Sequence, residues 1–181
     1  MLEGTQGNRK GQKSPEELGE RSRLWNHKDS FSILNGKIGT RKIRVLVLDM
    51  HFLKEDESEW NRFWPTAALK SRRGMSNLQL LQISHVQLCG DYKSFPKGLR
   101  WLHWSHFPLQ RIPNDFSLDK LVALGMPYSC LKKVLNGTKC LVFLKILNLS
   151  HFHYLFETPD FSSCQISRLI LKNCTRLAKV N

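Results

Sequence analysis

Hydrophobic side chains recur along the chain at a nearly constant spacing, with polar residues between them. A six-residue pattern with apolar first, fourth and sixth positions occurs five times, and its starts at residues 78, 99, 121, 144 and 166 lie 21, 22, 23 and 22 residues apart. Alternate side chains of an extended strand point the same way, so the fourth and sixth positions of each copy face one side. The pattern therefore predicts one short strand per copy and a stack of repeats that share a core.

Two further features extend the pattern. An earlier copy, Ile43, Leu46 and Leu48, stands 35 residues ahead of Leu78, which indicates an insertion in that repeat. Three residues after each sixth position comes another inward site, occupied in turn by Val86, Phe107, Ser129, Phe152 and Cys174. Leucine-rich repeats have this spacing, so the predicted fold class is α/β: a solenoid with a curved parallel sheet inside and short helical or irregular convex returns outside.

The part before the repeats has a different composition. Residues 1–13 contain almost no apolar side chains, which predicts disorder. Ser14-Pro15-Glu16-Glu17 has the form of a helix N-terminus, and a second short helix is expected from about Asp29 to Leu34, before Asn35-Gly36. We interpret residues 1–42 as a partly disordered linker and residues 43–181 as about six repeats, the last one incomplete.

The segment LRWLHWSHFPLQRIP, residues 99–113, concentrates aromatic and histidine side chains. The repeat pattern places Trp104 in the core and Trp101 on the outward row, and it places both prolines of the segment in the return. A metal site is not expected, because His103 and His106 do not converge at the end of a strand and no cysteine or carboxylate completes a zinc site. No catalytic residues are expected either, since no base is placed beside Cys174 and no G-x-S-x-G motif occurs.

Charge indicates the kind of partner. The chain has a formal net charge of +13, and residues 78–181 carry thirteen Lys/Arg against five Asp/Glu. Such a chain is drawn to polyanions or to an acidic protein face. The five cysteines are odd in number and lack metal-binding spacing, which favours free thiols in a cytoplasmic protein. The start of the chain lacks the apolar core of a signal peptide, and no stretch is long and apolar enough to predict a membrane span.

The candidate functional surface is the outward concave row with its flank, because stacked strands align equivalent positions into one surface. Its predicted members are Gln82, His85, Trp101, His103, His106, Tyr128, Asn148, His151, Arg168 and Lys172. Trp, Tyr and Arg dominate the energetics of protein interfaces, so a protein partner is expected. The alternative from another class is a basic nucleic-acid-binding scaffold, suggested by the net charge and by Arg100, Trp101 and Arg168.

Several phrases in order resemble the junction and first repeats of plant disease resistance receptors of the TIR-NBS-LRR class. They are RSRLW at 21–25, GTRKIRVLVLD at 39–49, MSNLQLLQI at 75–83, LRWLHW at 99–104, LKILNLSH at 144–151 and ETPDFS at 157–162. The resemblance implies a role in plant innate immunity, with a pathogen effector, a host protein or the receptor's own nucleotide-binding domain as partner. It also implies a cytoplasmic location, with the nucleus as a second compartment, and the alternative of a truncated product without an independent role.

The resemblance does not extend to the catalytic and nucleotide-binding parts of that class. A TIR domain that cleaves NAD is not recognisable, and neither is the phosphate loop G-x-x-x-x-G-K-[ST]. Gly36-Lys37 is the only Gly-Lys pair, and Ile38 follows where a hydroxyl side chain is needed. We therefore expect no enzyme activity and no cofactor in this chain, with ADP or ATP bound only by full-length relatives.

Overall fold

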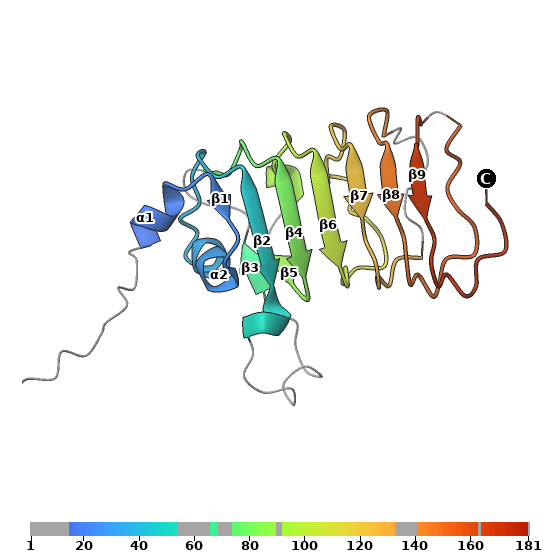
Figure 1. Ribbon diagram of the computed structural model, residues 1–181, viewed down its shortest axis with the longest axis horizontal. Helices are drawn as coiled ribbons and strands as arrows, with labels where there is room; N and C mark the ends of the chain where they lie inside the picture. Colours follow the sequence, from blue (N-terminus) through green and yellow to red (C-terminus); the bar gives the residue numbers. More distant parts are fainter. Residues whose placement is uncertain are drawn as a thin grey trace, which may run out of the picture.

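The computed structural model describes residues 15–53, 66–68, 74–89, 92–132, 141–162 and 164–180. Its main element is a seven-stranded sheet in which all neighbouring strands are parallel. Figure 1 shows these strands side by side in chain order, from β1 at one edge to β9 at the other. They are β1 (Arg23–Leu24), β2 (Val45–Asp49), β4 (Leu80–Ser84), β6 (Trp101–Ser105), β7 (Ala123–Gly125), β8 (Ile146–Asn148) and β9 (Arg168–Ile170). This arrangement confirms the predicted solenoid.

The register of the strands places the repeated leucines in one line. Leu46, Leu81, Leu102, Leu124, Leu147 and Leu169 are paired from strand to strand, and Leu24 precedes them as a further member. The second inward position forms a parallel line in which Ile83 pairs with Leu48 on one side and Trp104 on the other. Since a single repeat cannot bury both sides of its leucine layer, the stack is what removes these side chains from water. Each fully buried leucine contributes about 1.5–3 kcal/mol.

Backbone hydrogen bonds fix this register at the start of each strand of the seven-stranded sheet from β2 to β9. One carbonyl in each repeat accepts two N–H groups from the next repeat, at distances of 2.8–3.1 Å. The accepting carbonyls belong to Ser22, Arg44, Gln79, Arg100, Val122 and Lys145. A shift by one residue would turn the leucines outward and break these bonds together, so the register is strongly specified.

Aromatic side chains fill the space behind the middle strands. Trp104 is fully buried, as predicted, and its indole N–H donates to the carbonyl of Val86 at 3.2 Å. Its ring lies edge-on to that of Phe107, with centroids 4.6 Å apart, and Phe95 and Phe116 pack behind it at 4.2 Å from each other. The returns are irregular or short 3-10 turns, η1 (Met50–Leu53) and η3 (Tyr92–Ser94). The strands β3 (Thr66–Ala68) and β5 (Gln87–Cys89) form a separate parallel pair.

The described part of the segment interpreted as a linker packs against the repeats, which the sequence did not predict. It contains helices α1 (Pro15–Gly19) and α2 (His27–Asn35) as well as β1. Ile33 and Leu34 of α2 are fully buried in the same core as the leucine line. Helix α2 begins two residues before the expected Asp29, because the Asn26 side chain accepts from the N–H groups of residues 28 and 29.

Several predictions lie outside the described residues. These are the disorder of residues 1–13, the Ser14 cap of the first helix and most of the insertion before residue 78. The first helix itself is present, as expected from Pro15 onward.

Candidate interaction surface

The side of the seven-stranded sheet that points away from the leucine line is here called the open face. Along the strands of the seven-stranded sheet, buried residues alternate with less buried ones, as in β2, β4 and β6. Strand pairing aligns the outward residues into two rows. The first row comprises Arg23, Val45, Leu80, Trp101, Ala123, Ile146 and Arg168, and the second comprises Val47, Gln82, His103, Gly125, Asn148 and Ile170.

The first row is mostly apolar and ends in arginine on both sides. Trp101 and Ile146 have 38% and 39% of their surface exposed, although both are large hydrophobic side chains. Ala123 lies between them in register, since it pairs with Trp101 on β6 and with Ile146 on β8. Arg168 is exposed at the end of the row. The predicted members Trp101 and Arg168 thus lie in one row with apolar neighbours.

The second row holds three of the predicted residues, Gln82, His103 and Asn148. The imidazole of His103 lies over β7, because a Cβ atom added to Gly125 would be 2.6 Å from its Nδ1. Glycine is what allows this approach, since any larger residue would meet the ring. Burial lowers the pKa of His103 below its ordinary value, so the ring is neutral at pH 7.

The other predicted residues lie at the carboxyl ends of the strands. The rings of His85, His106, Tyr128 and His151 stack on one another in sequence, and we call these four residues the ring column. Their centroids are 4.0 Å, 5.0 Å and 4.1 Å apart along the column. The predicted residue Lys172 is exposed beside its end, and its carbonyl accepts the N–H of His151 at 2.7 Å. The predicted surface therefore divides into the two rows and the ring column.

A left-handed backbone conformation produces the ring column. All four of its residues have positive φ, between 54° and 61°, and Asn173 in the following repeat has φ 58°. Histidine and asparagine adopt this conformation more readily than most residues do. The equivalent turn in each repeat points its side chain in the same direction, so the rings meet at about the strand spacing of 4.8 Å.

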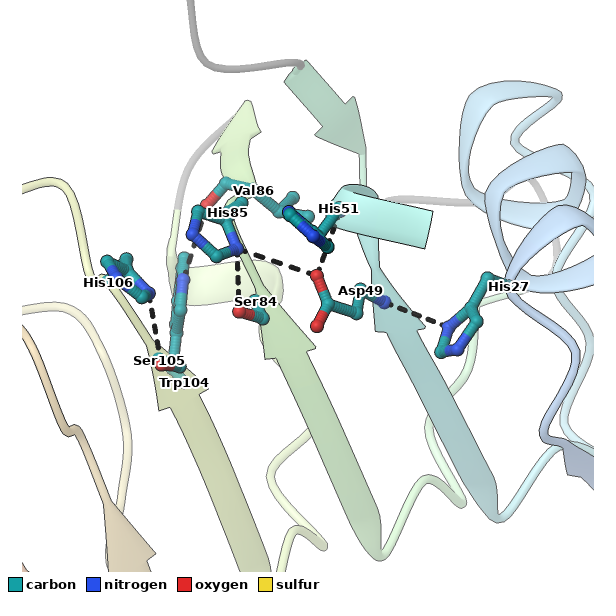
Figure 2. Close-up of polar contacts among 9 residues, drawn as sticks. All are labelled: His27, Asp49, His51, Ser84, His85, Val86, Trp104, Ser105 and His106. Atoms are coloured by element: carbon teal, nitrogen blue, oxygen red, sulfur yellow. Dashed lines mark hydrogen bonds and ion pairs between the residues drawn. The ribbon is translucent and has the colours of Figure 1, made fainter. Parts of the chain in front are cut away.

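Asp49 is the acidic group beside the ring column, as Figure 2 shows. Its Oδ1 lies 3.5 Å from Nδ1 of His85 and accepts the N–H of His51 at 2.9 Å. The Asp49 N–H in turn donates to Nδ1 of His27 at 3.0 Å. Serine hydroxyls contact the column as well, since Ser84 Oγ lies 2.9 Å from Nδ1 of His85 and Ser105 Oγ 3.1 Å from Nδ1 of His106.

Burial and the neighbouring imidazole keep His106 uncharged at pH 7. They lower the pKa of His106 to about 4, with burial as the larger cause, then His85, while Asp49 acts in the opposite direction. An uncharged His106 stacks on His85 without charge repulsion. His106 is therefore uncharged at pH 7 within a closely stacked column.

Two kinds of feature, a cluster of metal-ligating side chains and a helix able to cross a membrane, are absent from the residues that the structure describes. Within its described ranges, no three His, Cys, Asp or Glu side chains gather closely enough to hold a metal ion. Across the same residues, no helix has the length and apolar character needed to cross a bilayer. Cys174 is a half-buried free thiol whose Sγ donates to the carbonyl of Leu149 at 3.1 Å.

Sequence reasoning missed the apolar members of the first row. Val45, Leu80 and Ile146 were not among the predicted surface residues, because an apolar residue next to a core leucine resembles another core residue. A usable signal was their position, one residue before the fourth position of each copy. Ile146 in particular combines that position with high exposure.

Known proteins of similar sequence come from plant defence. No protein-family model matches the chain. It is 33% identical over 172 residues to the disease resistance protein LAZ5 of Arabidopsis thaliana, covering 87% of this chain and 14% of that protein. It is 35% identical over 149 residues to the disease resistance protein RRS1 of the same plant, covering 77% of this chain and 11% of that protein. It is also 33% identical over 171 residues to the disease resistance protein RPP2A of Arabidopsis thaliana, covering 90% of this chain and 12% of that protein. The chain thus spans at most 14% of the length of these three relatives.

Proposed function

Since the chain belongs to the family of plant disease resistance proteins, of which it represents a leucine-rich-repeat segment, we propose that it is a protein-interaction and regulatory module in plant defence. Its partner is a pathogen effector, a host protein or the nucleotide-binding domain of the same receptor. Contact of the open face with a pathogen effector gives recognition, and contact of the same face with the nucleotide-binding domain gives autoinhibition. Contact takes place in the cytoplasm, with the nucleus as a second compartment.

The observation that supports this proposal is the first row of the open face. It presents Trp101 and Ile146 at nearly 40% exposure, a state that is unfavourable for large apolar side chains in water. These side chains do not hold the fold together, because the leucine line lies on the other side of the strands. Tryptophan and arginine are among the residue types that contribute most to the binding free energy of protein interfaces.

We further propose that this chain has no catalytic centre and binds no nucleotide. The support comes from Gly36-Lys37, which follows the C-terminal end of α2, where the Gly36 N–H donates to the carbonyl of Ser32 at 2.9 Å. Phosphate groups bind at helix N-termini, where N–H groups are free and the dipole is positive. Gly36-Lys37 thus lies at the C-terminal end of α2, where the helix dipole is unfavourable for a phosphate group.

Proximity labelling in plant cells tests the proposed function. The chain is fused to a biotin ligase, and biotinylated proteins are compared between the wild type and a Trp101→Ser/Ile146→Ser variant. We expect labelling of the main partner to fall about fivefold or more, as for loss of central interface residues. The control is Tyr154→Ser/Phe156→Ser, which removes two large side chains that are even more exposed, at 55% and 67%, from the return after β8.

Three outcomes are informative. Loss of labelling in the first variant alone supports contact through the open face. Equal labelling by all three chains contradicts it. A wild type that labels no protein above the level of the free ligase supports a truncated product without an independent role.

A further inference from the structure

Strand β7 carries the smallest outward side chains of the middle of the open face. Its first-row residue is Ala123 and its second-row residue is Gly125, whereas the neighbouring strands present Trp101 and Ile146 beside Ala123. Neighbouring strands lie about 4.8 Å apart, so the backbones that carry Trp101 and Ile146 are about 10 Å apart. That separation matches the width of one apolar side chain placed between two others.

The second row bounds this position on one side. His103 extends from β6 over Gly125 and is neutral and partly buried. A side chain that entered from solvent above Ala123 would therefore contact the indole of Trp101, the aliphatic chain of Ile146 and the edge of the His103 ring. All three contacts suit an aromatic or branched aliphatic group.

Three exposed basic residues stand next to the first-row residues around the same position. Arg100 precedes Trp101, Lys145 precedes Ile146, and Arg168 pairs with Ile146 from β9, and all three are exposed. Among the residues that the structure describes, no carboxylate forms an ion pair with any of them. In the seven strands Asp49 is the only acidic residue, and it lies on β2, three strands from β7. An acidic partner would find unpaired cations here.

The stacked rings favour a protein over a nucleic acid as the source of that negative charge. Proteins that bind single-stranded nucleic acids offer free aromatic faces on which bases stack. In the ring column the faces of His106 and Tyr128 are covered by their neighbours on both sides. In the first row Trp101 is followed by the aliphatic residues Ala123 and Ile146, so this row offers one exposed ring rather than the series of free ring faces on which successive bases stack.

We propose that the surface around Ala123 binds an acidic protein segment that inserts one large apolar side chain between Trp101 and Ile146. Carboxylates on both sides of that side chain pair with Arg100, Lys145 and Arg168. This inference rests on the proposed function and specifies the chemistry of the partner. The partner is defined by an apolar residue flanked by acidic ones.

Titration by NMR with short peptides tests the inference. The probe is a capped pentapeptide with phenylalanine between two pairs of acidic residues. Two comparison peptides replace either the acidic residues with lysine or the phenylalanine with serine, and an oligothymidine represents nucleic acid. The readout is the indole N–H resonance of Trp101, assigned with Trp101→Phe, in the complete chain.

Two other tryptophans serve as internal controls. Trp25 is 57% exposed and follows β1, four strands away from β7, so its resonance should not move. The buried indole of Trp104, which donates to Val86, reports that the fold is intact. A variant that keeps the Trp104 resonance is therefore folded, and its binding result can be interpreted.

We expect the acidic phenylalanine peptide to shift the Trp101 resonance and to bind about tenfold more tightly than either comparison peptide. Ala123→Leu should weaken binding about tenfold, since it fills the position between Trp101 and Ile146. Arg100→Glu/Lys145→Glu should also weaken binding about tenfold. The control Lys93→Glu/Lys97→Glu makes the same change in net charge on a return and should have little effect on binding.

The inference is overturned if the lysine peptide binds equally well, if the oligothymidine binds more tightly at Trp101, or if no peptide moves the resonance. Its failure is distinct from failure of the proposed function. If labelling in cells is lost with Trp101→Ser/Ile146→Ser while the peptides show no acidic preference, the open face binds a protein of different chemistry. If labelling does not depend on the open face, the proposed function itself is wrong.

Discussion

The imidazole rings of His85 and His106 stack with their centroids 4.0 Å apart, although one complete repeat separates them in the chain. Both residues adopt a left-handed backbone, with φ of 54° and 56°. This conformation costs most residues about 1–2 kcal/mol. Contacts between rings in successive repeats offset that cost, so the turn and the stack support each other.

Substitutions at His106 should show how much of its contribution to stability comes from its left-handed backbone rather than from its ring. Val is β-branched and is a steric outlier at positive φ, whereas Asn accepts that conformation. We expect His106→Val to lower the free energy of unfolding by about 1–2 kcal/mol more than His106→Asn does. Urea unfolding followed by circular dichroism measures the difference. Equal stability of the two variants would show that the left-handed turn imposes no such constraint in solution.

The ring column should make stability depend on pH. The pKa of His106 is lowered to about 4 in the folded chain from an ordinary value of 6.5. Between those values the unfolded chain binds the proton and the folded chain does not, so stability is greatest above pH 6.5 and falls as the pH drops toward 4. His103, whose pKa burial also lowers, acts in the same direction.

The measurement is the urea midpoint of unfolding at pH 7.5 and at pH 4.5. We expect a lower midpoint at pH 4.5, and a smaller difference in His106→Asn, which has no titrating group at that position. Asp160, whose pKa the Ser162 hydrogen bonds lower, titrates below this range and does not contribute. A midpoint that rises toward pH 4.5 would contradict the assigned direction.

The leucine line was predictable from sequence because its spacing is nearly constant and because buried strands demand apolar residues at fixed positions. Its first member, Leu24, was missed for a physical reason. The residues that would complete its pattern are Arg21, three positions earlier, and Asn26, two positions later. Arg21 instead pairs with Asp29 at 3.0 Å, and Asn26 caps α2.

The outward facing of Trp101 and the inward facing of Trp104 followed from alternation along one strand, and both agree with the structure. The stacking of the ring column did not follow from it. Alternation describes strands, whereas these rings stand on turns beyond the strand ends. The only sequence signal was the series His, His, Tyr, His and Asn at equivalent positions, with residue types that tolerate positive φ.

Gly125→Ala should move His103 away from β7. The new Cβ would lie 2.6 Å from the His103 Nδ1, and the ring can rotate toward solvent to avoid it. We expect the pKa of His103 to rise toward its ordinary value as burial is lost, with a change in stability below about 1 kcal/mol. NMR titration of the imidazole measures this pKa. Ala123→Ser, on the same strand and face, is the control and should leave the pKa unchanged.

The division of each strand into a core side and an open face is the central claim, and urea unfolding of two variants tests it most directly. Leu147 is fully buried between Leu124 and Leu169, so Leu147→Asp should cost more than about 4 kcal/mol and abolish the cooperative transition. Trp101→Ala should cost less than about 1 kcal/mol and keep that transition. Equal destabilisation by both substitutions would contradict the assigned facing of the strands.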